Sequence, residues 1–349
     1  MIIYILIIFF VCCYIYLEKK LIGRDALIIP VIFLSIIAAL RNYTVGTDTP
    51  TYTLPFLKGL NFYSYTINPN IEIGYEYLVK LILLFTNNYS IYFFIISFFI
   101  IFLNFLVIKK YAVNYLFSIY LYIALGFYTI IYNPVRQSIA MAIVFMSLPY
   151  LLEKKLFKFC LIVYLASLFH ISALIFIPIY FLLHLKLRIE TKFVILFLGS
   201  TFLSKVLLIY LNNSNERYSN YTDIYLDNGD GRITVLFYSL LGFYIYLCGK
   251  KMRNNYIYAN FEQLLICGLG ISIPILFLGT DPSGPLRILN YFTWFFIFLL
   301  PYTVMLYSYK SRKFILILMV FFFFLYYLTI VNLFGGIVPY IINPSFEIF

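Results

Sequence analysis

The chain has 349 residues and a formal net charge of +11, yet only 11% of its residues are charged and 64% are hydrophobic. An ordinary soluble domain is about 25% charged, so the composition excludes a water-soluble fold. The five cysteines lie in or beside apolar runs without metal-ligand spacing, which excludes a zinc module and favours small core residues.

Most apolar runs are long enough for a helix to cross a hydrocarbon layer of about 30 Å, and they lack the alternation of barrel strands. We therefore predict an all-α fold, a polytopic integral membrane helical bundle that forms a single membrane domain over residues 1–349. The first run has no basic residue before it and no small-residue cleavage site, so we expect a retained helix rather than a signal peptide. In chain order, the twelve predicted transmembrane helices are 2–17, 26–40, 90–108, 114–132, 135–152, 156–170, 171–185, 192–211, 232–248, 261–279, 286–308 and 314–334. The sixth and seventh are short, and either a hairpin or one broken helix would fit them.

Basic clusters between these helices predict the orientation. If the loop at 18–25 is cytoplasmic, every later Lys/Arg cluster falls on the same side, as the positive-inside rule requires. The positive net charge is then explained by the orientation of the chain in the membrane rather than by nucleic-acid binding. In this orientation both termini lie outside. Residues 41–89 and 212–231 become outer loops. Residues 71–85 must then not span, and Glu72, Glu76 and Lys80 at intervals of four predict an amphipathic helix on the outer interface.

The basic residues on the outer side differ in kind from those inside. This topology places 13 Lys and 4 Arg inside, but 3 Lys and 5 Arg outside. Arginine is favoured where a planar fork must hold phosphate or carboxylate. The segments "NPVRQ" (133–137) and "GPLRI" (284–288) each place a proline at the expected first turn of a helix, with an arginine two residues later beside free amides that attract anions. We predict a diphosphate site, although such side chains could instead extend to lipid headgroups. The five outer arginines are Arg41, Arg136, Arg217, Arg232 and Arg287.

Two further side chains are candidates for proton transfer. Asp48 in "VGTDT" could accept a proton from a sugar hydroxyl, or it could simply form an Asx-turn in a Gly/Thr/Pro loop. His170 in "SLFHIS" lies near the outer side, where it is either a second candidate base or a hydrogen-bonded structural histidine.

The loop 212–231 contains "DNGDG", but Leu226 and Phe237 occupy the positions where a calcium loop needs carboxylates, so we expect a turn and no metal. Walker, G-x-S-x-G, H-E-x-x-H and C-x-x-C motifs are missing from the sequence. No predicted span carries a charge near its middle, which argues against an ion-coupled transporter.

Several segments together resemble the EpsG family, membrane proteins of exopolysaccharide assembly related in role to Wzy polymerases. The more specific elements are R-x-x-x-V-G-x-D-x-x-x-Y and V-R-Q-x-I-A, and the tail "FGGIVPYIINPSFEIF" matches only loosely. The resemblance runs from about residue 40 to about residue 300, over "RNYTVGTDTPTY" (41–52), "EIGYEYL" (72–78), "NPVRQSIAMAI" (133–143), "LASLFHISALIFIPIY" (165–180) and "RILNYF" (287–292).

The resemblance implies a metal-independent glycosyltransferase without a cofactor, with a GT-C-like integral-membrane architecture. It would act as an exopolysaccharide or O-antigen polymerase in the bacterial cytoplasmic membrane, with its active site facing outward. The reaction moves a growing glycan from undecaprenyl diphosphate to the sugar of another undecaprenyl-diphosphate-linked repeat unit. The implied partners are these two lipid-linked oligosaccharides and membrane lipid, with a chain-length regulator as a further candidate and no nucleic acid. The residues that the resemblance carries over are Arg41, Asp48, Tyr52, Glu72, Arg136, Gln137, His170 and Arg287. Taking the resemblance together with the pattern of outer arginines, we expect Asp48, His170 and Glu72 to be catalytic, the five outer arginines to bind diphosphate, and Gln137, Tyr52 and Tyr291 to bind substrate.

Two alternatives use the same lipid-linked substrate. A flippase should show cations at several depths and an internal two-fold repeat, and neither is visible in the sequence. An O-antigen-type ligase would be expected to carry a larger outer loop than residues 212–231.

Overall fold

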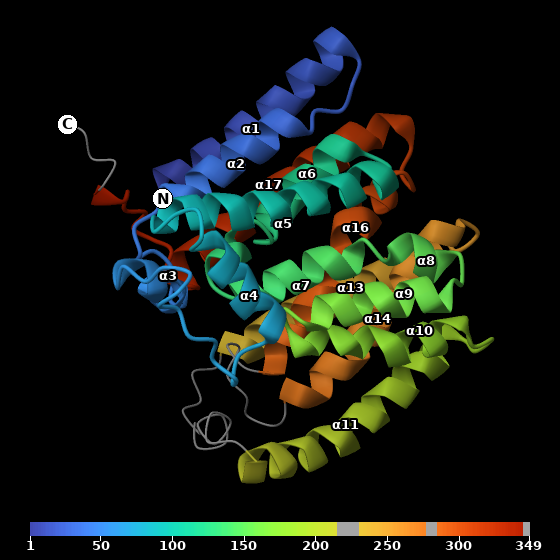
Figure 1. Cartoon of the computed structure of the whole chain (residues 1–349). Coiled ribbons are helices and arrows are strands. Elements are labelled where there is room, and N and C mark those ends of the chain that lie inside the picture. Colours follow the sequence, from blue (N-terminus) through green and yellow to red (C-terminus); the bar gives the residue numbers. More distant parts are fainter. Residues whose placement is uncertain (215–229, 277–284, 345–349) are drawn as a thin grey trace. The chain divides into compact units, whose positions relative to one another are not determined.

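The computed structural model describes residues 1–214, 230–276 and 285–344 (Figure 1). Within these ranges every regular element is a helix, and one isolated antiparallel bridge joins Arg41 to Ile342. The all-α prediction is therefore confirmed for the described part of the chain. The chain divides into two compact units, the first formed by residues 1–176 and 309–349 and the second by residues 177–308.

In the first unit, α2 packs along α5, α5 also contacts α7, and α7 packs on α9 (Figure 1). Both α1 and α17 contact α6, so the N-terminal and the last long helix belong to the same unit. Its helices are α1 (Ile2–Ile22), α2 (Ile28–Ala39), α3 (Thr49–Leu57), α4 (Ile73–Ile82), α5 (Tyr89–Tyr111), α6 (Tyr115–Ala124), η1 (Thr129–Tyr132), α7 (Val135–Phe145), α8 (Leu148–Leu152), α9 (Leu156–Ser167), η2 (Ile171–Ile175) and α17 (Tyr309–Leu333).

The second unit is organised around α14, which contacts α11, α13, α15 and α16. Phe261 on α14 packs against Phe295 and Phe298, with ring centroids 5.2 and 5.0 Å away, and all three side chains are buried. The helices that belong to this unit are α10 (Phe176–His184), α11 (Ile189–Ser214), α13 (Asp230–Gly249), α14 (Tyr256–Leu276), η3 (Pro285–Ile288), α15 (Leu289–Thr293) and α16 (Phe296–Val304).

All twelve predicted spans contain helix, but only five helices of the described residues are long and apolar enough to cross a membrane. They are residues 2–22, 89–111, 231–249, 256–275 and 309–333. By contrast, α2 has 12 residues, and at a rise of about 1.5 Å per residue it covers only about 18 Å of a layer about 30 Å thick. The predicted pair 156–170 and 171–185 is broken, since α9 ends at Ser167 and η2 precedes α10. The total of twelve spans stays a prediction.

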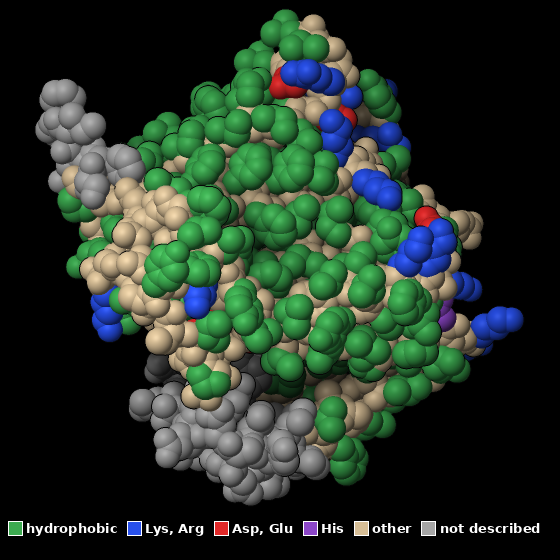
Figure 2. All heavy atoms as spheres, in the orientation of Figure 1, with side chains coloured by type: hydrophobic (Ala, Val, Ile, Leu, Met, Phe, Trp, Pro, Cys, Tyr) green, Lys and Arg blue, Asp and Glu red, His purple; other side chains and the backbone are tan. Residues whose placement is uncertain are grey.

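The surface of the protein is dominated by apolar side chains. On the face shown in Figure 2, hydrophobic side chains cover most of the area, and Lys and Arg gather beside the turn that follows α1. Exposed large apolar residues include Phe9 on α1 and Phe321 on α17, at 66% and 60% exposure. Such contiguous apolar surface suits contact with lipid rather than water.

The helix predicted over 71–85 forms as α4, but its polar residues do not share one solvent-facing stripe. Glu76 is only 1% exposed and accepts hydrogen bonds from the Tyr65 hydroxyl at 3.0 Å and the Asn68 amide at 2.7 Å. The exposed face instead carries Ile73, Tyr77 and other apolar side chains. The charge spacing predicted the helix, while the partners of Glu76 in the preceding loop decided which face is buried.

Candidate functional site

Three of the predicted site residues meet in the first unit. Glu72 is the N-cap residue of α4, Arg136 lies in the first turn of α7, and His170 directly precedes η2. Arg136 Nη1 donates to Glu72 Oε2, and His170 Nδ1 lies 2.7 Å from Glu72 Oε1. Arg136 and His170 are 64 and 98 positions from Glu72 in the sequence. We call this group the Glu72 cluster.

A close backbone contact places α4 against the segment that carries His170. The Gly74 amide donates to the Leu168 carbonyl oxygen at 2.8 Å. A Cβ atom at position 74 would lie 2.7 Å from that oxygen, which real Cβ atoms do not tolerate. Glycine at this position therefore allows the first turn of α4 to reach Leu168, which brings Glu72 within hydrogen-bonding distance of His170.

The charge state of Glu72 follows from its two partners. Burial raises the pKa of Glu72, but the hydrogen bond with His170 and the charge of Arg136 outweigh it and lower the pKa to about 2. At neutral pH the carboxyl group is thus ionised and too weak a base for general-base catalysis. It instead accepts a hydrogen bond from His170 Nδ1, which leaves Nε2 as the ring nitrogen able to take a proton.

The Glu72 cluster is accessible from the protein surface. The side chains of Arg136, Glu72 and His170 are 16%, 18% and 28% exposed. Arg136 is further held by aromatic residues, since it hydrogen-bonds the Tyr52 hydroxyl and its Cζ lies 5.9 Å from the centroid of the Tyr75 ring. The Tyr52 and Tyr75 rings meet edge to face at 5.8 Å. The guanidinium is therefore held by Glu72, Tyr52 and Tyr75 while part of the side chain stays exposed.

Two other predicted residues of the first unit lie beside these elements. Asp48 is the N-cap residue of α3, and its backbone amide donates to Asn133 Oδ1 at 3.2 Å, three residues before Arg136. Gln137 follows Arg136 on α7 and is 2% exposed.

Arg41 has a different environment from Arg136. It is 1% exposed, its Cζ lies 3.6 Å from the Phe93 ring centroid and 4.4 Å from that of Tyr132, and Nη1 donates to the Ala38 carbonyl. Its Nε and Nη2 have no hydrogen-bond partner among the described residues. In this structure the guanidinium supports the packing of α5 and η1, and its diphosphate role stays a prediction.

The remaining predicted residues belong to the second unit or lie outside the described residues. Arg287 is half-buried in η3, a 3-10 turn where an α-helical first turn was predicted, Arg232 is exposed on α13, and Tyr291 is buried in α15. Arg217 lies outside the described residues, as does most of the loop 212–231. The proposal that five arginines share one site thus stays a prediction.

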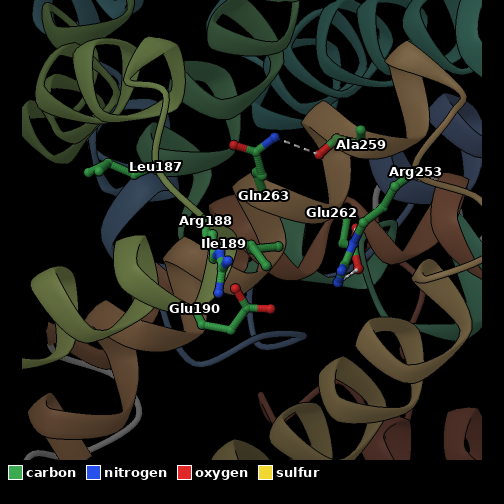
Figure 3. A pocket seen from close by; sticks show the side chains of 8 residues that line it. All are labelled: Leu187, Arg188, Ile189, Glu190, Arg253, Ala259, Glu262 and Gln263. Atoms are coloured by element: carbon green, nitrogen blue, oxygen red, sulfur yellow. Dashed lines mark hydrogen bonds and ion pairs between the residues drawn. The ribbon is translucent and has the colours of Figure 1, made fainter.

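The second unit contains a pocket of about 550 Å³ that is lined by both charged and apolar side chains (Figure 3). Arg253 on one wall donates to both oxygens of Glu262, at 2.8 and 2.9 Å, and a Cβ at Gly249 would lie 2.1 Å from Glu262 Oε1. The guanidinium and the carboxylate neutralise each other's charge and form two hydrogen bonds with each other, as in a structural ion pair. Its lining residues are Leu187, Arg188, Ile189, Glu190, Arg253, Ala259, Glu262 and Gln263.

Sequence reasoning named Glu72, Arg136 and His170 but did not connect them, and it missed Tyr75, Gly74 and Asn133. Asn133 was visible in the segment "NPVRQ", but nothing in that segment indicates which loops its amide contacts. Among the residues that the structure describes, no three His, Cys, Asp or Glu side chains gather as metal ligands would.

These observations define a helical protein with several membrane-crossing candidates and a partly exposed carboxylate–guanidinium–imidazole cluster. The model of the EpsG family matches residues 26–342, and the chain belongs to this family. The predicted resemblance is confirmed, and the match extends through most of the tail that the sequence motifs matched only loosely. Family membership indicates a polysaccharide polymerase type of function, consistent with a glycosyltransferase-like enzyme and a multi-pass membrane protein. Comparisons with curated proteins and with solved structures found no match.

Proposed function

We propose that the protein is a Wzy-type repeat-unit polymerase with a GT-C-like architecture. It transfers a growing glycan from undecaprenyl diphosphate to the sugar of a second undecaprenyl-diphosphate-linked unit, at the outer face of the bacterial cytoplasmic membrane. The observation that carries this proposal is the Glu72 cluster, in which one ionised carboxylate aligns a guanidinium and an imidazole at a partly exposed position.

Arg136 acts on the leaving group in this proposal. Glycosyl transfer breaks the bond between the anomeric carbon and the diphosphate oxygen, so negative charge accumulates on the departing lipid diphosphate. A fixed guanidinium stabilises that charge without reorganising during the reaction. The contacts with Tyr52 and Tyr75 keep Arg136 in place, and its pairing with Glu72 neutralises it until the substrate binds.

His170 acts on the acceptor. As the acceptor oxygen bonds to the anomeric carbon, its hydroxyl proton moves to Nε2 of His170, while Nδ1 remains hydrogen-bonded to Glu72. Glu72 orients the ring and stabilises the imidazolium that forms, as its low pKa allows. His170 later releases the proton to water. Asp48, with its amide held by Asn133, is the alternative base.

The test replaces each of these groups in cells and follows the lipid-linked intermediates. Arg136→Lys and His170→Gln should each lower polymer formation by about 10²-fold, the usual effect of losing one preorganised catalytic group. Arg287→Lys tests the predicted second diphosphate ligand in the same way. Arg24→Lys is the matched control, because Arg24 also pairs with a glutamate, Glu18, but is 67% exposed and lies in the loop after α1.

The intermediate that accumulates distinguishes the three functions. Single lipid-linked units on the outer face of Arg136→Lys cells support a polymerase. Accumulation on the cytoplasmic face would instead identify a flippase, and full-length polymer left on its lipid would identify a ligase. Polymer of normal length in both Arg136→Lys and His170→Gln cells would refute the proposed site.

A further inference from the structure

The side-chain amide of Asn133 joins three segments that are distant in sequence. Its Oδ1 accepts from the Asp48 amide at 3.2 Å and from the Thr47 hydroxyl at 3.3 Å, and its Nδ2 donates to the Gly335 carbonyl at 2.9 Å. Asn133 itself lies between η1 and α7, three residues before Arg136. One carboxamide thus links the Asp48 loop, the C-terminal segment and the start of α7.

The C-terminal segment, residues 334–343, runs beside the loop at 40–47, and we call it the C-terminal strap. Four backbone hydrogen bonds of 2.8 to 3.1 Å join the two: Asn42 N to Ile341 O, Gly46 N to Gly336 O, Thr47 N to Gly335 O, and Asn343 N to Leu40 O. The strap therefore fixes the loop along most of its length.

The strap is in turn anchored to long helices. The Tyr4 hydroxyl of α1 donates to the Ile337 carbonyl at 2.7 Å, and Asn343 Nδ2 donates to Ser90 Oγ of α5 at 2.9 Å. Ile337 is 3% exposed. The strap thus connects the loop to α1 and α5.

The loop leads directly to the Glu72 cluster. It continues into α3, whose first residue Thr49 donates from its hydroxyl to the Tyr132 carbonyl at 2.9 Å. One turn further along α3, the Tyr52 hydroxyl accepts a hydrogen bond from Arg136. The α3 helix is thus attached to residues 132–136 at three points, one of which is the Asn133 amide.

Two glycines with positive φ make room for this amide. Gly335 has φ 76° and Gly46 has φ 105°. A Cβ at Gly335 would lie 2.4 Å from Asn133 Nδ2, and one at Gly46 would lie 2.9 Å from Asn133 Oδ1. The loop at Gly46 and the strap at Gly335 therefore both leave the space that the Asn133 carboxamide fills.

We propose that Asn133 is a positioning residue for the polymerase site, through which the C-terminal strap holds the Asp48 loop and Tyr52 in register with Arg136. Both polar atoms of the amide are engaged by protein groups, so in this proposal Asn133 acts on substrate through Arg136 and Tyr52. The catalytic consequence rests on the proposed function, whereas the attachment of the strap does not.

The test uses two variants and a matched control in the full-length protein in lipid nanodiscs. Asn133→Asp keeps the acceptor for Asp48 but replaces the donor to Gly335 with an oxygen that repels its carbonyl. Gly335→Ala introduces a Cβ into the space of Nδ2. Gly23→Ala is the control, since Gly23 has φ 79° and no atom within 4 Å of its would-be Cβ. It thus has the same backbone strain as Gly335→Ala without the clash.

Two quantities are then measured for each protein: the hydrogen-exchange rates of its backbone amides, and its steady-state kinetics with lipid-linked repeat units as substrate. In Asn133→Asp and Gly335→Ala, the amides of Asn42, Gly46, Thr47 and Asn343 should exchange at least about tenfold faster than in Gly23→Ala. The kcat for polymer formation should fall about tenfold, which corresponds to about 1.4 kcal/mol, with KM within about twofold of the wild type.

Each result decides one part of the inference. Exchange equal to that of Gly23→Ala would overturn the attachment of the strap by Asn133. Faster exchange with an unchanged kcat, or a rise in KM alone, would overturn its positioning role. A wild-type protein without polymerase activity would refute the proposed function, and with it the catalytic consequence, while the exchange rates would still decide the attachment.

Discussion

Removing the charge of Glu72 should make the protein measurably less stable, and only at a pH where that carboxylate is ionised. The ordinary pKa of 4.5 falls to about 2 in the folded protein, a difference of about 2.5 units. At about 1.4 kcal/mol per unit, the ionised group contributes roughly 3 kcal/mol to folding. The side chain is only 18% exposed, so solvent screens this contribution little. Because the folded pKa is lowered, the contribution is present above about pH 4.5 and disappears as the pH falls towards 2.

The assay compares apparent melting temperatures of wild type and Glu72→Gln in nanodiscs between pH 7 and pH 3. For a protein of 349 residues, about 3 kcal/mol corresponds to a decrease of roughly 4 °C for Glu72→Gln at pH 7. The gap should narrow below pH 4.5, because Glu72 of the unfolded wild-type chain then takes up a proton while the folded carboxyl group stays ionised, which favours the unfolded state. Glu153→Gln is the control, since Glu153 pairs with Lys155 on the surface at 52% exposure, and it should melt within about 1 °C of wild type. A Glu72→Gln protein that melts like wild type at every pH would show that the carboxylate does not hold Arg136 and His170.

Three other substitutions test neighbouring contacts. Gly74→Ala should lower the melting temperature by several degrees, because its Cβ would lie 2.7 Å from the Leu168 carbonyl oxygen. The control Gly199→Ala has open space at its Cβ and should not lower the melting temperature. Equal melting temperatures for the two variants would contradict the close packing of α4. His170→Gln should lower kcat about 10²-fold with the KM for acceptor little changed, and an unchanged kcat would assign the base to another group. Arg41→Met should reduce the free energy of unfolding by about 1–2 kcal/mol, because the cation–π contacts with Phe93 and Tyr132 are lost. The KM for the donor should stay unchanged, and a large rise in this KM would instead show that Arg41 binds the donor directly.

The helices could be predicted from the sequence, because apolar runs and the Glu72–Glu76–Lys80 spacing depend on local periodicity. Their lengths could be predicted less well. The apolar run at 135–152 contains two helices, α7 and α8, separated by Met146 and Ser147. Apolar composition alone does not indicate where a helix breaks inside such a run.

The candidate site could be predicted as a set of residues but not as a geometry. Glu72, Arg136 and His170 were all expected to act on substrate, while the structure makes Glu72 the partner of the other two. Arg41 and Asp48 are close in sequence, yet one is buried against Phe93 and the other is bound through its amide to Asn133. A single sequence contains no information on pairings that span 64 to 98 positions, and those pairings set each side chain's charge and access to substrate.

The most direct test of the central claim is reconstitution of the purified protein in nanodiscs with undecaprenyl-diphosphate-linked repeat units and no other protein. We predict that wild type releases one undecaprenyl diphosphate for each new glycosidic bond, and that Arg136→Lys lowers this rate about 10²-fold without unfolding. Lipid-linked units that remain unjoined with folded wild-type protein, or release at the same rate by wild type and Arg136→Lys, would contradict the claim.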